Sequence, residues 1–134
     1  MNIRRAVPVL VIFLFCWIPM AISQIEMEKK DVDTIRNPTP PNETSQDRGR
    51  ELFMSRCVVC HGMEGRGDGP HSESLGVPPW DFTQDITDVT DGDLFNGIKN
   101  GGQFLWMPPF GLILMDDQIW DVINYLRLLE KGGN

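Results

Sequence analysis

Helical spacing of apolar residues is clearest near the end of the chain, over residues 116–130. The apolar positions recur three and four residues apart, which places them on one face of a helix. They are Ile119, Val122, Ile123, Leu126 and Leu129. Asp116 and Asp117 precede them, where the positive end of a helix dipole favours acidic side chains. The pattern predicts an amphipathic helix over 116–130, in which Trp120 and Tyr125 are packing aromatics.

A second helix is predicted to begin near residue 46. Ser45 or Asp47 can cap its first turn, and it runs through Gly49 and Phe53 into residues 57–61. Gly49 and Phe53 are four apart and share a face. Glycine normally weakens a helix, so its position here indicates that another element packs closely against that face. The alternative is ordinary tolerance of a glycine near a helix end.

A third, shorter helix is predicted after Thr90. Capping residues stand in front of it at 90–93, and glycine follows it at 101–102. Loops between the helices are rich in glycine and proline, with four glycines among residues 62–70 and the run Pro78-Pro79-Trp80-Asp81-Phe82. The chain is therefore predicted to be all-α, with three to four short helices.

The candidate chemistry lies at the end of the second helix, in the run Cys57-Val58-Val59-Cys60-His61. This C-x-x-C-H spacing is typical of covalent c-type haem attachment. Cys57 and Cys60 can each form a thioether with one haem vinyl group, and His61 is then held under the iron as an axial ligand. We expect one covalent haem c, and the glycine-rich loop 62–70 is expected to pack against it.

Two other interpretations of these five residues are weaker. A zinc site usually needs four ligands, and adjacent Cys60 and His61 could hardly reach one tetrahedral ion together. The other candidate ligands are only His71 and Cys16. A thioredoxin-like C-x-x-C is expected in a βαβ unit, whereas its surroundings here are helical and glycine-rich.

The second axial ligand is predicted to be Met107, in the run Phe104-Leu105-Trp106-Met107-Pro108-Pro109-Phe110. Its thioether is flanked by aromatics and prolines, and it lies far enough after His61 for the chain to reach the opposite haem face. The alternatives are a Met107 that merely fills the core, ligation by Met115 or His71, and an open sixth position.

Three more residues are predicted to surround the haem. A ligating histidine usually donates its second ring nitrogen to an acceptor, and the carbonyl of Pro70 is the candidate. Trp80 and Trp106 are candidates for packing against the haem. His71 is expected to be a surface histidine.

The first 23 residues are predicted to be a secretory signal peptide. Arg4 and Arg5 are followed by an apolar run over 6–20, and Ala21-Ile22-Ser23 provides a cleavage site after Ser23. The less favoured alternative is an uncleaved anchor, because the run is shorter than the ~20 residues that span a bilayer. Either places the rest of the chain outside the cytoplasm, in the periplasm.

The remaining boundaries follow from composition. Residues 24–45 are charged and proline-rich without an apolar period, so we predict a tether. Residues 46–131 are predicted to be the folded domain, and 132–134 a tail. The formal net charge of −7 argues against nucleic acid as a partner. It suits a protein partner with a positive or weakly charged docking face.

The domain over 46–131 resembles the class I c-type cytochromes, especially the small bacterial type with one haem ligated by histidine and methionine. The resemblance is carried by Gly49, Phe53, residues 57–61, Gly67-Asp68-Gly69-Pro70, Met107-Pro108-Pro109-Phe110 and residues 120–126. It implies the cytochrome c fold, in which the first and last helices cross, with Gly49 and Phe53 against Val122 and Tyr125. It also implies a proline carbonyl behind the histidine, matching Pro70. Relatives commonly have Ser or Thr where Met115 stands, so Asp116 is expected to cap the last helix.

These features predict an electron-transfer protein rather than an enzyme: a periplasmic one-electron carrier between respiratory redox proteins, which dock transiently. The alternative is a fixed haem c subunit of a membrane-associated oxidoreductase complex. A less favoured one is a ligand-binding or peroxidase-like haem protein in which Met107 is displaced. Contact with a membrane is expected only through an uncleaved first segment or a partner complex.

Overall fold

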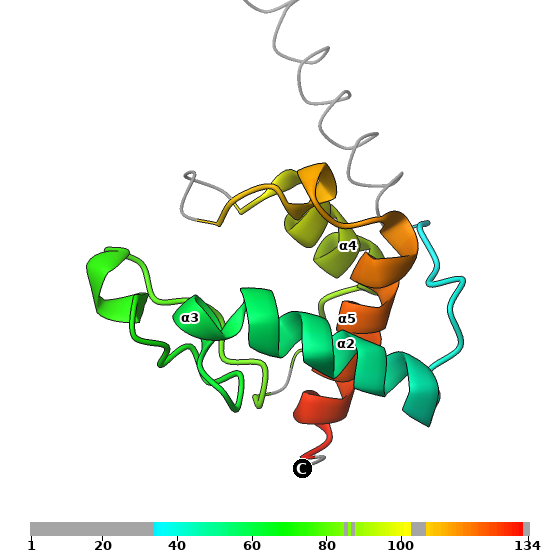
Figure 1. Ribbon diagram of the computed structural model, residues 1–134, viewed down its shortest axis with the longest axis horizontal. Helices are drawn as coiled ribbons and strands as arrows, with labels where there is room; N and C mark the ends of the chain where they lie inside the picture. Colours follow the sequence, from blue (N-terminus) through cyan, green and yellow to red (C-terminus); the bar gives the residue numbers. More distant parts are fainter. Residues whose placement is uncertain (1–33, 85, 87, 103–106, 133–134) are drawn as a thin grey trace, which may run out of the picture. The chain divides into compact units, whose positions relative to one another are not determined.

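A computed structural model describes residues 34–84, 86, 88–102 and 107–132 of the chain, and within them every regular element is helical (Figure 1). The α-helices are α2 (Glu43–Arg56), α3 (Val58–His61), α4 (Asp91–Asn100) and α5 (Asp116–Glu130), and the 3-10 helices are η1 (Ser72–Ser74) and η3 (Phe110–Leu112). This confirms the predicted all-α class. In the part of the chain just given, no helix is long and apolar enough to cross a membrane.

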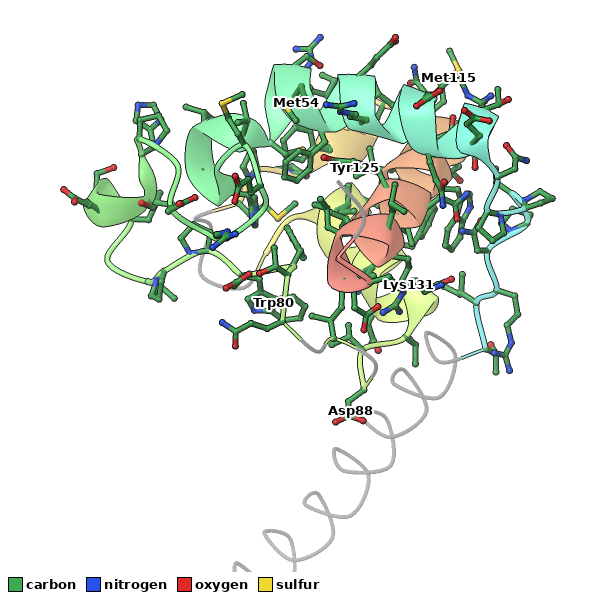
Figure 2. The ribbon with its side chains drawn as sticks, turned by 90° about the horizontal axis from the view of Figure 1, so that it is seen from below. Met54, Trp80, Asp88, Met115, Tyr125 and Lys131 are labelled. Atoms are coloured by element: carbon green, nitrogen blue, oxygen red, sulfur yellow. The ribbon has the colours of Figure 1, made fainter. Side chains whose placement is uncertain are left out.

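The domain is built on the crossing of α2 and α5, which Figure 1 shows lying across each other. Gly49 makes the close approach possible, because a Cβ atom on it would lie 2.0 Å from the backbone oxygen of Asp121 and 3.0 Å from Cβ of Tyr125. One turn on, the rings of Phe53 and Tyr125 lie 5.4 Å apart, and Figure 2 shows Tyr125 between the two helices. The expected packing of Gly49 and Phe53 against Tyr125 is confirmed.

An ion pair with two hydrogen bonds lies beside this crossing. The guanidinium of Arg48 donates from Nε and Nη2 to the two carboxylate oxygens of Asp121, at 2.6 and 2.7 Å. Asp121 is 4% exposed, whereas the side chain of Arg48 is half exposed. Asp121 raises the pKa of Arg48 by this hydrogen bonding. The buried carboxylate therefore has a charged partner, as a group removed from water requires.

Helix α2 begins earlier than predicted, and its cap is neither Ser45 nor Asp47. Asn42 is the N-cap: its side chain accepts from the backbone N–H of Ser45, and the Ser45 hydroxyl accepts from the backbone N–H of Asn42. This reciprocal pair is a capping box. Ser45 is therefore the third residue of the helix, where it is 1% exposed.

The second half of the predicted tether lies on the folded domain. Ile35 packs against the hydrophobic core. Asn37 donates from Nδ2 to Oδ1 of Asn124 at 2.8 Å, and Asn124 donates from Nδ2 to the carbonyl of Thr39 at 3.2 Å. We call residues 35–42 the strap. The composition predicted a tether because the strap has few apolar residues, but the buried amide of Asn124 supplies polar contacts instead.

Helix α4 agrees with the prediction. The Thr90 hydroxyl accepts from the backbone N–H of Asp93, while Asp93 accepts from the backbone N–H of Thr90, and Gly101 ends the helix with φ 87°. The helix packs on α5 through Phe95, whose ring is stacked on that of Trp120 with centroids 4.2 Å apart.

The predicted bounds of the last helix are also confirmed, since α5 runs over Asp116–Glu130. The expectation that Asp116 caps it is wrong. Met115 occupies the N-cap position, and the side chain of Gln118 accepts from its backbone N–H at 2.9 Å. Asp116 is the first helical residue, and its carboxylate instead accepts from Nζ of Lys99 at 2.8 and 2.9 Å.

Candidate haem-attachment site

The two cysteines and the histidine lie on a single helical turn. Helix α2 ends at Arg56, Cys57 links it to α3, and the N–H groups of Cys60 and His61 both donate to the carbonyl of Cys57, at 3.1 and 2.9 Å. Both thiols are free and half-buried. The chain thus presents two thiols at the ends of one turn with the imidazole directly after them.

The glycine-rich loop that follows packs back onto this turn. The N–H groups of Gly67, Gly69 and His71 donate to the carbonyls of His61, Cys60 and Val59, at 2.8, 3.1 and 2.9 Å. A Cβ atom on Gly69 would lie 2.6 Å from the backbone of the turn, so only glycine fits there. The loop therefore satisfies carbonyls that so short a helix leaves without partners. Its contact with haem stays a prediction.

His61 is held from two sides. Its Nδ1 lies 3.3 Å from the carbonyl oxygen of Trp80, and its ring lies 4.7 Å from the ring of Phe82 at an angle of 30°. When Nδ1 donates to that carbonyl, Nε2 keeps the lone pair that a metal ligand needs. Burial lowers the pKa of His61, and the hydrogen bond to Trp80 opposes that shift. The neutral imidazole, which is the ligating form, is thereby favoured.

The carbonyl of Pro70 was predicted to accept a hydrogen bond from His61. In the structure Pro70 is exposed, and the carbonyl that lies at Nδ1 of His61 is that of Trp80. The glycine-rich loop runs along the Cys57–His61 backbone through Gly67 and Gly69. The role of Pro70 beside the haem-ligating histidine stays a prediction.

The structure describes only one of the two tryptophans that were predicted to pack against the haem. Trp80 is 55% exposed. Its packing against haem stays a prediction, and Trp106 lies outside the described residues. Phe82, which the sequence analysis did not single out, is 7% exposed, and its N–H donates to the carbonyl of Gly65 at 2.7 Å. The only feature of the sequence that could have pointed to Phe82 was its place in the run 78–82.

Met107 lies on a separate segment that is held by the end of α4. Its carbonyl accepts from the N–H of Gly102 at 3.2 Å, and Cβ atoms on Gly101 and Gly102 would lie 2.7 and 3.1 Å from its backbone oxygen and its Cβ. Its half-buried side chain packs against the core cluster. Ligation of iron by Met107 stays a prediction. His71 is exposed, as expected.

The two thiols differ in their surroundings. Burial, together with the neighbouring Cys60, raises the pKa of Cys57 to about 12. Cys57 is therefore a neutral thiol at neutral pH. A buried neutral thiol behaves as a small apolar side chain, in keeping with the contact that Cys57 makes with the core cluster.

The residues of this turn fit a covalently attached haem better than a protein-ligated metal ion. Over 34–84, 86, 88–102 and 107–132, no three His, Cys, Asp or Glu side chains are grouped so that they could hold a metal. Two unpaired thiols on one turn, with an imidazole whose Nδ1 is already occupied, are the donor set that a c-type haem requires.

An all-α domain in which a short helix presents two free thiols and an oriented histidine defines a c-type haem protein. A family model described as "Cytochrome c" matches residues 46–130. The chain belongs to this family, and it is accordingly an electron-transfer protein that carries covalently bound haem c.

Three similar proteins give this assignment context. The chain is 24% identical over 97 residues to a thiosulfate dehydrogenase of Thiomonas intermedia, covering 70% of this chain and 30% of that protein. It is 29% identical over 83 residues to the cytochrome c subunit of a quinone-dependent alcohol dehydrogenase of Gluconobacter oxydans, covering 59% of this chain and 17% of that subunit. The cytochrome c subunit of gluconate 2-dehydrogenase from Pantoea cypripedii is also 29% identical, over 84 residues, covering 59% of this chain and 19% of the subunit.

A solved structure is similar as well. A chain of the reducing HAO-like protein complex of Kuenenia stuttgartiensis has a TM-score of 0.61 and 28% identity, covering 71% of this chain and 49% of that one. This chain thus spans less than a third of the curated relatives and about half of the solved one.

Proposed function

We propose that this protein is a one-electron carrier with a single haem c. The number of haems follows from the single C-x-x-C-H run in the sequence. The proposal depends most on one observation: the free thiols of Cys57 and Cys60 share a turn with His61, whose Nδ1 is engaged by a backbone carbonyl.

Each residue has a defined part in this proposal. Cys57 and Cys60 would hold the haem through thioethers. His61 would bind its iron through Nε2, and the Trp80 carbonyl together with the Phe82 ring holds the imidazole in orientation. When bound, the haem supplies one-electron redox chemistry.

Met107 completes the site in this proposal. Its backbone is tied to Gly101 and Gly102, which limits where its thioether can lie. A thioether in the second axial position would raise the reduction potential and leave no open position for a substrate. This favours electron transfer over ligand binding or peroxide cleavage.

The expected location is the periplasm or the outer face of the inner membrane, where redox proteins would dock transiently as electron donors and acceptors. The basis is the sequence pattern of residues 1–23, which lie outside the described residues.

The second candidate is a fixed haem subunit of an oxidoreductase complex. It is favoured by the relatives, two of which are named as cytochrome c subunits of dehydrogenases. In that role the same site would pass electrons within one assembly.

Optical spectroscopy of Met107→Ala tests the proposed ligation. The purified haem-loaded wild type should show a low-spin spectrum with the weak long-wavelength band of ferric iron bound by methionine. Met107→Ala should lose that band and bind carbon monoxide rapidly when reduced. The matched control is Met63→Ala, since Met63 is 71% exposed and should leave the spectrum unchanged. A wild type that lacks the band removes Met107 from the site.

Fractionation distinguishes the carrier from the subunit. The full-length chain with a carboxyl-terminal tag is followed in extracts of its source organism by haem absorption and size-exclusion chromatography. A carrier should elute at the mass of the free chain. Co-elution with other redox proteins in stoichiometric amounts, stable in high salt, would favour the fixed subunit.

A further inference from the structure

Three large apolar side chains project into solvent between the last residue of η3 and the N-cap of α5. Leu112 is 83% exposed, Ile113 61% and Met115 72%. Figure 2 shows Met115 at the upper edge of the domain. We call these three residues the 112–115 patch. Contiguous apolar exposure of this kind usually marks an interaction surface.

Hydrogen bonds and close packing hold the backbone of the 112–115 patch in place. The N–H groups of Ile113 and Leu114 both donate to the carbonyl of Phe110, at 2.9 and 2.8 Å, and Leu114 between the exposed residues is 8% exposed in the core. Gly111 lies so close to α4 that a Cβ atom on it would be 2.8 Å from Cγ and from the carbonyl oxygen of Lys99. A surface held in this way loses little entropy when a partner covers it.

The position of the patch connects it to the proposed site. Leu112 follows Met107 by five residues, so their Cα atoms are at most about 17 Å apart even with the intervening chain fully extended. A protein that covers the patch would therefore also lie near the segment that carries the proposed methionine ligand.

The charges beside the patch indicate the chemistry of its occupant. Asp116 and Asp117 follow it directly and are both exposed, and the whole chain carries a net charge of −7. Lys99 is paired with Asp116. An acidic border disfavours an anionic lipid surface. It also disfavours a symmetric contact with a second copy, which would bring the same carboxylates together.

We infer that the 112–115 patch is the docking surface for a redox protein that presents an apolar recess bordered by Lys or Arg side chains. This inference rests on the proposed function, because it identifies the kind of partner with which the haem would exchange electrons. The apolar residues would supply contact area, while Asp117 and the net negative charge would steer the approach.

The test uses full-length haem-loaded protein and washed membranes of the source organism, supplied with a ubiquinol analogue. Each quinol releases two electrons and two protons, so it reduces two molecules of the ferric protein. In a parallel assay, the same membranes in air re-oxidise the ferrous protein, and the rate of that reaction is measured. The variant is Leu112→Ser/Ile113→Ser. The control is Val77→Ser, which also replaces an exposed apolar residue and lies outside both the patch and the loop 62–70.

The patch variant is expected to need about tenfold more protein for half-maximal exchange with the membranes, as for loss of interface anchors. Its melting temperature and its reduction by ascorbate should match the wild type. The control variant should exchange normally. The rate of electron exchange between the wild type and the membranes should fall as the salt concentration is raised. In Asp117→Asn this rate should depend less on salt.

Other results would contradict the docking surface, its occupant or the proposed function. Equal behaviour of the patch and control variants overturns the docking surface. Flotation of the wild type, but not the patch variant, with phosphatidylglycerol vesicles assigns the patch to lipid. A concentration-dependent dimer that the patch variant lacks assigns it to a second copy. Wild-type exchange that strengthens with salt overturns the cationic border. A wild type that exchanges electrons in neither direction defeats the proposed function itself.

Discussion

Gly49 is the residue on which the packing of α2 against α5 depends most directly. A Cβ atom on Gly49 would lie 2.0 Å from the backbone oxygen of Asp121. That oxygen belongs to a helix backbone, which cannot move aside as the end of a flexible side chain could. Any side chain at position 49 must therefore push the two helices apart.

Gly49→Ala is expected to lower the free energy of unfolding by about 3 kcal/mol, because overpacking a tight contact usually costs 1–3 kcal/mol or somewhat more. The measurement is urea denaturation of the haem-loaded protein, followed by circular dichroism. Gly97→Ala is the matched control: Gly97 is also helical, and a Cβ atom there meets nothing within 4 Å. That control should be neutral or slightly stabilising. Equal losses in the two variants would contradict the role of Gly49.

Asn124 is another residue whose role depends on its neighbours. It is a polar side chain on the buried face of α5, 2% exposed, and it bonds to Asn37, Thr39 and Ser45. A buried amide needs partners, so its presence among the apolar positions of 116–130 was a signal in the sequence that something polar must cover it. The sequence did not say which segment that would be.

At the scale of elements, the strap over 35–42 shows how a segment without an apolar period can still be ordered. Its backbone and side chains are bonded to α2 and α5, through the Pro40 carbonyl to the Ser45 hydroxyl and through Asn37 and Thr39 to Asn124. Its prolines at 38, 40 and 41 have no backbone N–H that would need a partner. The strap is thus held by a small number of hydrogen bonds.

Asn37→Ala should therefore loosen the strap locally. Removing one hydrogen bond that involves a buried partner is expected to cost about 1–2 kcal/mol, which corresponds to roughly tenfold faster amide exchange over residues 35–42. Hydrogen–deuterium exchange by mass spectrometry measures this, with α4 as the internal reference. Arg36→Ala is the control, since Arg36 is exposed. If both variants leave exchange over 35–42 unchanged, the bond to Asn124 does not hold the strap.

At the scale of the whole molecule, the folded part is small for a protein without a cofactor. Among the residues that the structure describes, 14 buried apolar residues form the core cluster. Domains of this size bury only a modest share of their surface and are marginally stable alone. We therefore expect attached haem to contribute a large part of the stability.

Preventing attachment tests that expectation. The double variant Cys57→Ala/Cys60→Ala, exported in the same way, should be largely unfolded at 25 °C, with little helical circular dichroism and no cooperative melt. Haem-loaded wild type is the reference. Val58→Ala/Val59→Ala, which alters the same turn but keeps both thiols, should remain red and folded. A colourless double variant that melts cooperatively would show that the polypeptide does not need haem to fold.

The sequence by itself determined the elements and the chemistry. Helical spacing and capping residues predicted α4 and α5, and the C-x-x-C-H run identified the haem-binding turn, because these signals act between residues close in the chain. The tertiary structure decided which distant groups meet: the Trp80 carbonyl at Nδ1 of His61, the strap on Asn124, and Asp116 on Lys99 instead of at the helix cap. Such contacts depend on how loops return to the core, which local spacing does not encode.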